Sequence, residues 1–93
     1  MSNRVMNLYS AYDRSAELFG ALFPADADAI AIRAFEAAII EPQQPSDISK
    51  YPDQFELYFV GSYDQSTGQL LPVKRGRPLS TGTQVISSRP KSA

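Results

Sequence analysis

Residues 55–73 read FELYFVGSYDQSTGQLLPV, two apolar segments separated by turn-forming residues. Large apolar side chains alternate with other residues in the first segment, as they do in a strand with one buried face. The expected inner face holds Phe55, Leu57 and Phe59, and the expected outer face holds Glu56, Tyr58 and Val60. Asp64–Gly68 has turn chemistry, with Gly68 able to supply a positive φ. We therefore expect a strand at Phe55–Tyr63 that turns back into a short strand at Gln69–Val73, where Pro72 suits a sheet edge.

Three further segments precede this hairpin. Val5–Tyr12 alternates like a strand, with Met6, Leu8 and Ser10 on one face. Ala16–Pro24 carries four large apolar residues around Gly20, and we expect a short helical turn there that plugs one end of the core. A helix is predicted from a capping residue, Asp26 or Asp28, to about Glu41, where Pro42 stops it. Its buried stripe consists of Ile32, Phe35 and Ile39, flanked by Ala31 and Ala38.

The order strand, helix, strand, strand predicts an α+β body over residues 1–73. One helix packs on a small, mostly antiparallel three-stranded sheet, and Pro42–Pro52 forms a loop. Ile30 and Ile40 fall outside the buried stripe, which indicates either a subunit interface or ordinary exposed apolar residues. Because one sheet face or edge stays free in such a small body, we expect a homo-oligomer, with a dimer as the first expectation.

Charge divides the chain into two parts. Residues 1–64 hold all ten acidic residues and four basic ones, a net charge of −6, whereas residues 65–93 hold five basic residues and no acidic one. The segment 74–93 also has prolines, many serines and threonines, and few large apolar residues. Such a composition predicts a flexible basic tail, because little burial offsets the entropy of ordering it.

The residue types that are missing limit the chemistry. The chain contains no cysteine and no histidine, which excludes Ser-His-Asp and Cys-His catalytic groups and zinc sites with sulfur or nitrogen ligands. The carboxylates do not have the spacing of a calcium loop, and there is no glycine-rich nucleotide motif. We expect no enzyme activity, no metal, no cofactor and no association with a membrane, since no apolar stretch is long enough to span one.

The tail contains Lys74-Arg75-Gly76-Arg77-Pro78, whose Arg-Gly-Arg-Pro core resembles the AT-hook. In that motif glycine lets the backbone approach the floor of an A·T-rich minor groove while arginines reach along it. A broader interpretation needs only phosphate contacts, made by the tail cations Lys74, Arg75, Arg77, Arg89 and Lys91 on single-stranded or duplex DNA. Tyr58 and Tyr63 on the neighbouring strand are then the nearest aromatic groups for stacking. A third interpretation has the tail docked on the acidic body.

The chain also resembles a family, the small nonstructural proteins of gokushoviruses, which are single-stranded DNA phages of the Microviridae. The resemblance is carried by an ordered set of short motifs between residues 7 and 73. These are Tyr9–Asp13 with Ala16 and Phe19, Ala29–Phe35, Tyr51–Tyr58, and Gly61–Asp64 with Thr67 and Gly68. The resemblance implies a non-capsid phage protein made in the cytoplasm of an infected bacterium, and it carries no catalytic residues.

Two functions follow as hypotheses. The first is a non-enzymatic regulator of viral genome replication or packaging that binds DNA or the replication machinery, with nucleic-acid contacts at Lys74, Arg75, Gly76, Arg77, Arg89 and Lys91. The second is a protein–protein adaptor that binds a host or phage protein through its sheet edge and the Ile30/Ile40 surface.

Overall fold

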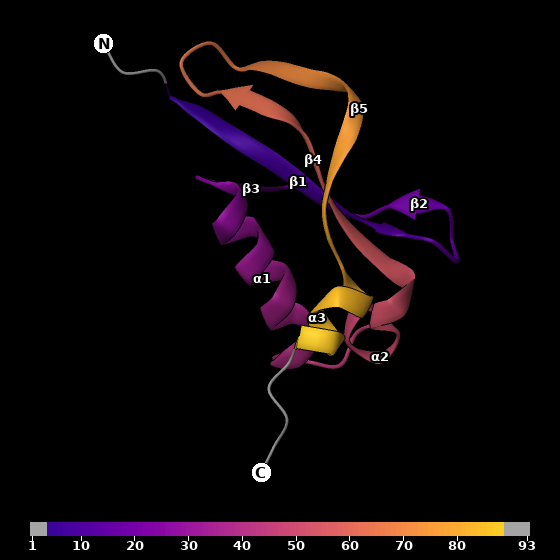
Figure 1. Cartoon of the computed structure of the whole chain (residues 1–93). Helices are drawn as coiled ribbons and strands as arrows, with labels where there is room; N and C mark the ends of the chain where they lie inside the picture. Colours follow the sequence, from indigo (N-terminus) through magenta and orange to yellow (C-terminus); the bar gives the residue numbers. More distant parts are fainter. Residues whose placement is uncertain (1–3, 89–93) are drawn as a thin grey trace.

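A computed structural model describes residues 4–88 and has an α+β architecture, which confirms the predicted class (Figure 1). Five antiparallel strands form one curled sheet, and three helices and one turn of 3-10 helix accompany it in the described residues. The strands are β1 (Val5–Asp13), β2 (Leu18–Phe19), β3 (Phe23–Ala25), β4 (Phe55–Asp64) and β5 (Gln69–Thr81). The helices are α1 (Asp28–Ile40), α2 (Asp47–Lys50) and α3 (Gly82–Ser88), with the 3-10 turn at Pro52–Gln54.

Strands β1, β4 and β5 make the body of the sheet in that spatial order, and the turn at residues 64–68 joins β4 to β5 as predicted. Gly68 has a φ of +77° there, which confirms its expected role. Both short strands pair with the free edge of β1, where β2 lies opposite Tyr12–Asp13 and β3 lies opposite Asn7–Tyr9. The prediction of a three-stranded sheet was therefore wrong, because β2 and β3 add two short strands at its edge.

The helical turn expected at Ala16–Pro24 is also wrong, because the segment runs along β1 instead. The Gly20 N–H donates to the Ala11 carbonyl at 2.9 Å, and the Ser10 hydroxyl donates to the Gly20 carbonyl at 2.9 Å. Pro24 stands opposite Leu8 on this outer edge, where its missing N–H costs no ladder bond. Pairing with a distant strand overrides the local apolar pattern.

Register shifts bend the long strands, and two of them meet at Val60 of β4. Val60 is an extra residue in β4 between the steps that pair Leu8 with Gly61 and Tyr9 with Phe59. In β5, Val73–Gly76 stand opposite that single residue, because Phe59 pairs with Arg77 and Gly61 pairs with Pro72. Bulges increase the local twist and bend a strand, and Figure 1 shows β5 turning sharply in its middle. We call Val73–Gly76 the cationic bulge.

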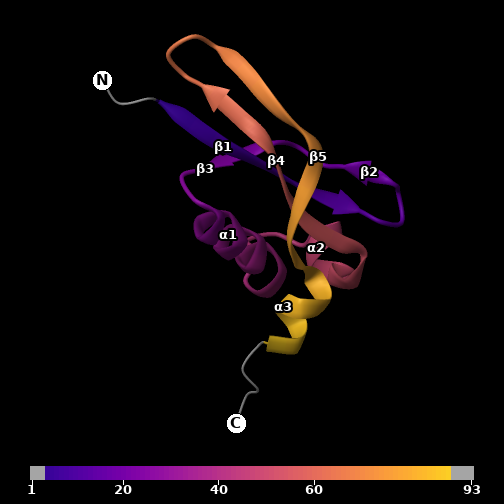
Figure 2. The same cartoon turned by 45° about the horizontal axis from the view of Figure 1, so that its top comes forward.

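Figure 2 shows the helices gathered on one side of the sheet. From α1, Ala31, Phe35 and Ile39 are buried against Tyr9 and Leu57. The predicted stripe is thus confirmed, with Ile32 at its half-buried margin. The other sheet face, which we call the outer face, carries no helix of the described residues.

The predicted capping of α1 by Asp26 or Asp28 is wrong. Ala27 is the N-cap residue and no side chain bonds to the first free N–H groups. Asp28 is instead the first helical residue, a favourable place for a carboxylate near the positive end of the helix dipole. Its oxygens bond to side chains of the sheet, as described below.

The flexible tail expected from Lys74 onward is wrong for residues 74–88, since β5 runs across the expected boundary after Val73 and leads into α3. The few apolar residues of this segment are well placed, with Val85 only 2% exposed and Leu79 packed against the core. Thr81 and Gln84 also exchange bonds of 3.0 Å, the Gln84 N–H to the Thr81 hydroxyl and the Thr81 N–H to the Gln84 side-chain oxygen. This capping box starts α3 and offsets its shortage of apolar residues.

Candidate nucleic-acid interface

Two adjacent cations, Lys74 and Arg75, are displayed on the cationic bulge. Both side chains are exposed, and within residues 4–88 neither forms an ion pair. The bulge interrupts the pairing of β5 with β4, so these residues stand out from the sheet ladder. The structure therefore places two predicted site residues together, in a position that can receive phosphate groups.

Arg77 has a different environment. Its guanidinium donates to an Asp28 carboxylate oxygen at 3.0 Å and lies 4.9 Å from the centre of the Phe59 ring. The other Asp28 oxygen accepts a 2.7 Å bond from the hydroxyl of the buried Tyr9. These bonds, first from Tyr9 and then from Arg77, lower the pKa of the Asp28 carboxyl. Arg77 thus ties β5 to α1, and a nucleic-acid role for it stays a prediction.

Gly76 lies between the exposed Arg75 and the ion-paired Arg77. A Cβ placed on Gly76 would lie 3.2 Å from Cδ2 of Tyr58, so the backbone of the bulge rests against that ring. Tyr58 alternates along β4 with the core residues Leu57 and Phe59, which puts its ring on the outer face, as the sequence indicated. The Arg-Gly-Arg motif is therefore divided, because Arg77 contacts Phe59 on the helix side while Gly76 contacts the outer face.

Three rings meet on the outer face beside the bulge, and we call Tyr12, Phe19 and Tyr58 the aromatic cluster. The ring centres lie 4.8 Å apart for Tyr12 and Phe19, 5.4 Å for Phe19 and Tyr58, and 6.4 Å for Tyr12 and Tyr58. Phe19 keeps 50% of its surface exposed. The Tyr58 hydroxyl donates to the Glu56 carboxylate at 3.2 Å, and partial burial, followed by that negative charge, raises the pKa of Tyr58.

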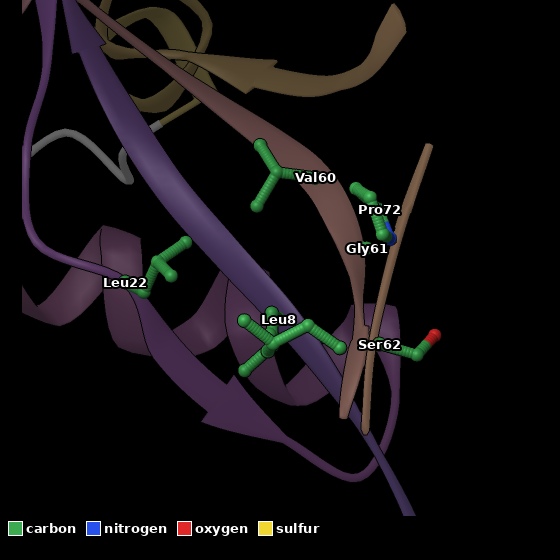
Figure 3. Close-up of a pocket in the computed structure, with 7 residues that line it drawn as sticks. Leu8, Leu22, Val60, Gly61, Ser62 and Pro72 are labelled. Carbon is green, nitrogen blue, oxygen red and sulfur yellow. The ribbon is translucent and has the colours of Figure 1, made fainter. Parts of the chain in front are cut away.

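A separate hollow of about 290 Å³ opens near the hairpin end of the outer face. Figure 3 shows its lining, which comes from β1, β4, β5 and the segment between β2 and β3. The apolar lining residues are Leu8, Leu22, Val60, Leu70 and Pro72, and no charged group lines it. It therefore offers no cation to hold a phosphate.

Comparison with known proteins identifies the family of the chain. The model of the phage ORF5 protein family matches residues 6–85, which span most of the chain. The chain belongs to the phage ORF5 protein family. Protein ORF5 of Chlamydia phage 1 is 33% identical over 73 residues, which cover 76% of each protein. No solved structure matches the chain.

Membership in the ORF5 family confirms the resemblance to small phage proteins drawn from the sequence motifs. Helices of the described part of the chain are too short or too polar to cross a membrane. Residues 4–88 likewise contain no group of three or more acidic side chains arranged to hold a metal ion.

The remaining predicted residues of this ORF5-family protein lie outside the cationic bulge or outside the residues that the structure describes. Ile30 and Ile40 are 46% and 38% exposed on α1, so the interface proposed for them is accessible, and it stays a prediction. Arg89 and Lys91 lie outside the residues that the structure describes. Tyr63 is 37% exposed, but it pairs with Leu70 near the end of the hairpin, away from the bulge.

Sequence reasoning missed Tyr12 and Phe19 as members of a site. The alternation in β1 placed Tyr12 with Ser10 on the face opposite Tyr9, so half of the signal was available. Phe19 carried no such signal, because its position depends on the pairing of the two-residue strand β2 with the end of β1.

Proposed function

We propose that this ORF5-family protein is a non-enzymatic nucleic-acid-binding protein that acts in the cytoplasm of the infected bacterium and regulates phage genome replication or packaging. The observation that carries the proposal is the cationic bulge, which presents two neighbouring exposed cations with no ion-pair partner among residues 4–88. Backbone phosphates supply most of the affinity of such contacts, so the binding should weaken steeply as salt rises.

The overall charge of the chain favours a small, local nucleic-acid interface over binding by the whole surface. The whole chain carries −1 at neutral pH, so a uniformly attractive field for nucleic acid is not available. Attraction has to come from the segment after residue 64, where no acidic residue occurs. Lys74 and Arg75 are the exposed cations of that segment that the structure leaves without a carboxylate, among the residues it describes.

Fluorescence-anisotropy titration tests the proposal. Single-stranded, A·T-rich duplex and G·C-rich duplex oligonucleotides are titrated at several salt concentrations with the wild type and with a Lys74→Ala/Arg75→Ala double variant. Each lost phosphate contact should reduce the slope of log affinity against log salt by about 0.7 on a single strand and about 0.9 on a duplex. The double variant should therefore flatten the slope by roughly 1.4 to 1.8.

An Arg33→Ala/Lys50→Ala variant is the matched control. It removes the same charge from exposed positions on α1 and α2, away from the bulge. Its slope should stay at the wild-type value. Absence of wild-type binding at physiological salt, or equal slopes in both double variants, would overturn the proposal.

A protein–protein adaptor is the second candidate, supported by exposed apolar groups on both sides of the molecule. Ile30 and Ile40 are open on α1, and the hollow near the hairpin is lined by apolar groups. The occupant proposed for the Ile30/Ile40 surface is a second copy of the chain, giving a homodimer. Sedimentation equilibrium of the wild type and of Ile30→Asp/Ile40→Asp measures this directly, and a monomeric wild type at micromolar concentration would refute the dimer.

A further inference from the structure

We infer that the nucleic acid is single-stranded and that one of its bases stacks on Phe19 of the aromatic cluster, an inference that rests on the proposed function. Stacking on an exposed aromatic ring is how proteins hold unpaired bases without reading their sequence. In a duplex the faces of the bases are covered by their neighbours, so such a ring has nothing to contact.

The aromatic cluster is built as a supported platform. Tyr12 and Tyr58 contact the Phe19 ring from two different strands and meet it at interplanar angles of 53° and 72°. The chain next to Phe19 is held by the Gly20 N–H bond to the Ala11 carbonyl and by the bond from the hydroxyl of Ser10, which is 1% exposed. Half of the Phe19 surface nevertheless faces outward. A ring held in this way loses little side-chain entropy when a base covers it.

The aromatic cluster lies beside the cationic bulge that carries Lys74 and Arg75. Gly76 rests on the Tyr58 ring, and Arg75 and Lys74 are the next residues along the chain. Consecutive Cα atoms are 3.8 Å apart, so the Cα atoms of Arg75 and Lys74 lie within about 4 and 8 Å of the Gly76 Cα atom. A strand with one base on Phe19 can therefore place its adjoining phosphates at Lys74 and Arg75. This pairing of a basic track with an aromatic surface is typical of single-strand binding.

The state of Arg77 argues against a groove-binding mode. Lying along a minor groove requires both arginines of the Arg-Gly-Arg motif, whereas Arg77 is bonded to Asp28 and stacked on Phe59. Of the two arginines of the motif, Arg75 is the one without a carboxylate partner among residues 4–88. Phosphate binding by Lys74 and Arg75 does not require Arg77 to leave Asp28.

Two substitutions at one exposed position separate ring stacking from burial. Phe19→Leu removes the ring but keeps an apolar side chain, and Phe19→Tyr keeps the ring. Stacking of one base is worth enough for its loss to weaken binding at least about fivefold. We expect that loss for Phe19→Leu with an oligothymidine strand, near-wild-type affinity for Phe19→Tyr, and an unchanged salt slope in both. Urea unfolding of each variant verifies the fold.

Photocrosslinking provides a readout that does not depend on affinity. Oligonucleotides with 5-iodouracil are irradiated with the full chain, and the adducts are mapped by peptide mass spectrometry. The adduct should fall on Phe19 or Tyr58, and an adduct on Tyr51 or Tyr63 instead would overturn the inference.

The outcomes distinguish this inference from the function on which it rests. If no oligonucleotide binds, the proposed function fails and the inference fails with it. If binding occurs through Lys74 and Arg75 but a duplex binds as well as a single strand, or Phe19→Leu binds like the wild type, the inference alone fails.

Discussion

Replacing Asp28 tests the link between the sheet and α1 and should change stability and nucleic-acid binding in opposite directions. Asp28→Ala removes the acceptor of the Tyr9 hydroxyl, whose side chain is fully buried, and the partner of Arg77. A hydrogen bond to a charged group contributes about 1.5–3 kcal/mol. The Asp28–Arg77 pair adds only about 0–1 kcal/mol, because its side chains are 38% and 54% exposed. The expected loss of unfolding free energy is therefore about 1.5–4 kcal/mol.

Urea denaturation measures this loss as a shift in midpoint at constant slope. Asp28→Asn is the matched control, since its side-chain oxygen can still accept from Tyr9 while the charge and its interaction with the helix dipole are lost. We expect it to cost about 1 kcal/mol. Both variants free Arg77 and remove a negative charge, so both should bind single-stranded DNA more tightly at low salt.

Two results would refute this reasoning. If Asp28→Ala unfolds within about 0.5 kcal/mol of the wild type, the Tyr9–Asp28 bond does not hold α1 to the sheet. If Asp28→Asn is as unstable as Asp28→Ala, charge rather than hydrogen bonding is the dominant contribution.

Three further predictions concern stability and charge. Leu57→Ala should lower the unfolding free energy by about 2–5 kcal/mol in urea denaturation, because Leu57 is fully buried in the core. Gly82→Ala should cost about 3 kcal/mol or more by the same assay, since a Cβ there would overlap the Pro52 carbonyl oxygen. The pKa of Asp28 is lowered below its unfolded value of 3.8, so its stabilisation is present above pH 3.8 and is lost as pH falls further through the folded-state value. Urea midpoints measured across that range should fall less in Asp28→Asn than in the wild type.

One more prediction concerns the outer face. Glu56 places a carboxylate at the Tyr58 hydroxyl, beside the proposed stacking surface. Glu56→Gln keeps an acceptor there and removes the negative charge, so anisotropy titration should show tighter binding to oligothymidine at low salt and no change at high salt. Weaker binding by this variant would contradict the placement of the strand on this face.

Sequence alone was sufficient for α1, for β4 and for the turn that follows it. The helical spacing of Phe35 and Ile39 and the alternation of Leu57 with Tyr58 report directly which side of each element is buried. The turn residues ending in Gly68 impose their own backbone geometry. A family assignment was also available, because motifs in these elements occur in order along the chain.

The segment after Val73 shows where composition misleads. Its low apolar content predicted flexibility, but the capping box of Thr81 and Gln84 was a readable local signal for α3. That the segment before it becomes β5 depends on pairing with β4, which is absent from any window of the sequence.

The candidate site was decided by tertiary structure. Sequence identified Lys74, Arg75 and Arg77 as equivalent cations of one motif. Folding gives Arg77 a carboxylate partner 49 residues away and leaves the other two without one among residues 4–88. Phe19 reaches Tyr12 and Tyr58 only because β2 pairs with the end of β1. Local patterns set which side of an element is buried, because that depends on the residue's own helix or strand period. Which side chains meet across elements depends on register and bulges, and these are fixed only when the whole sheet is assembled.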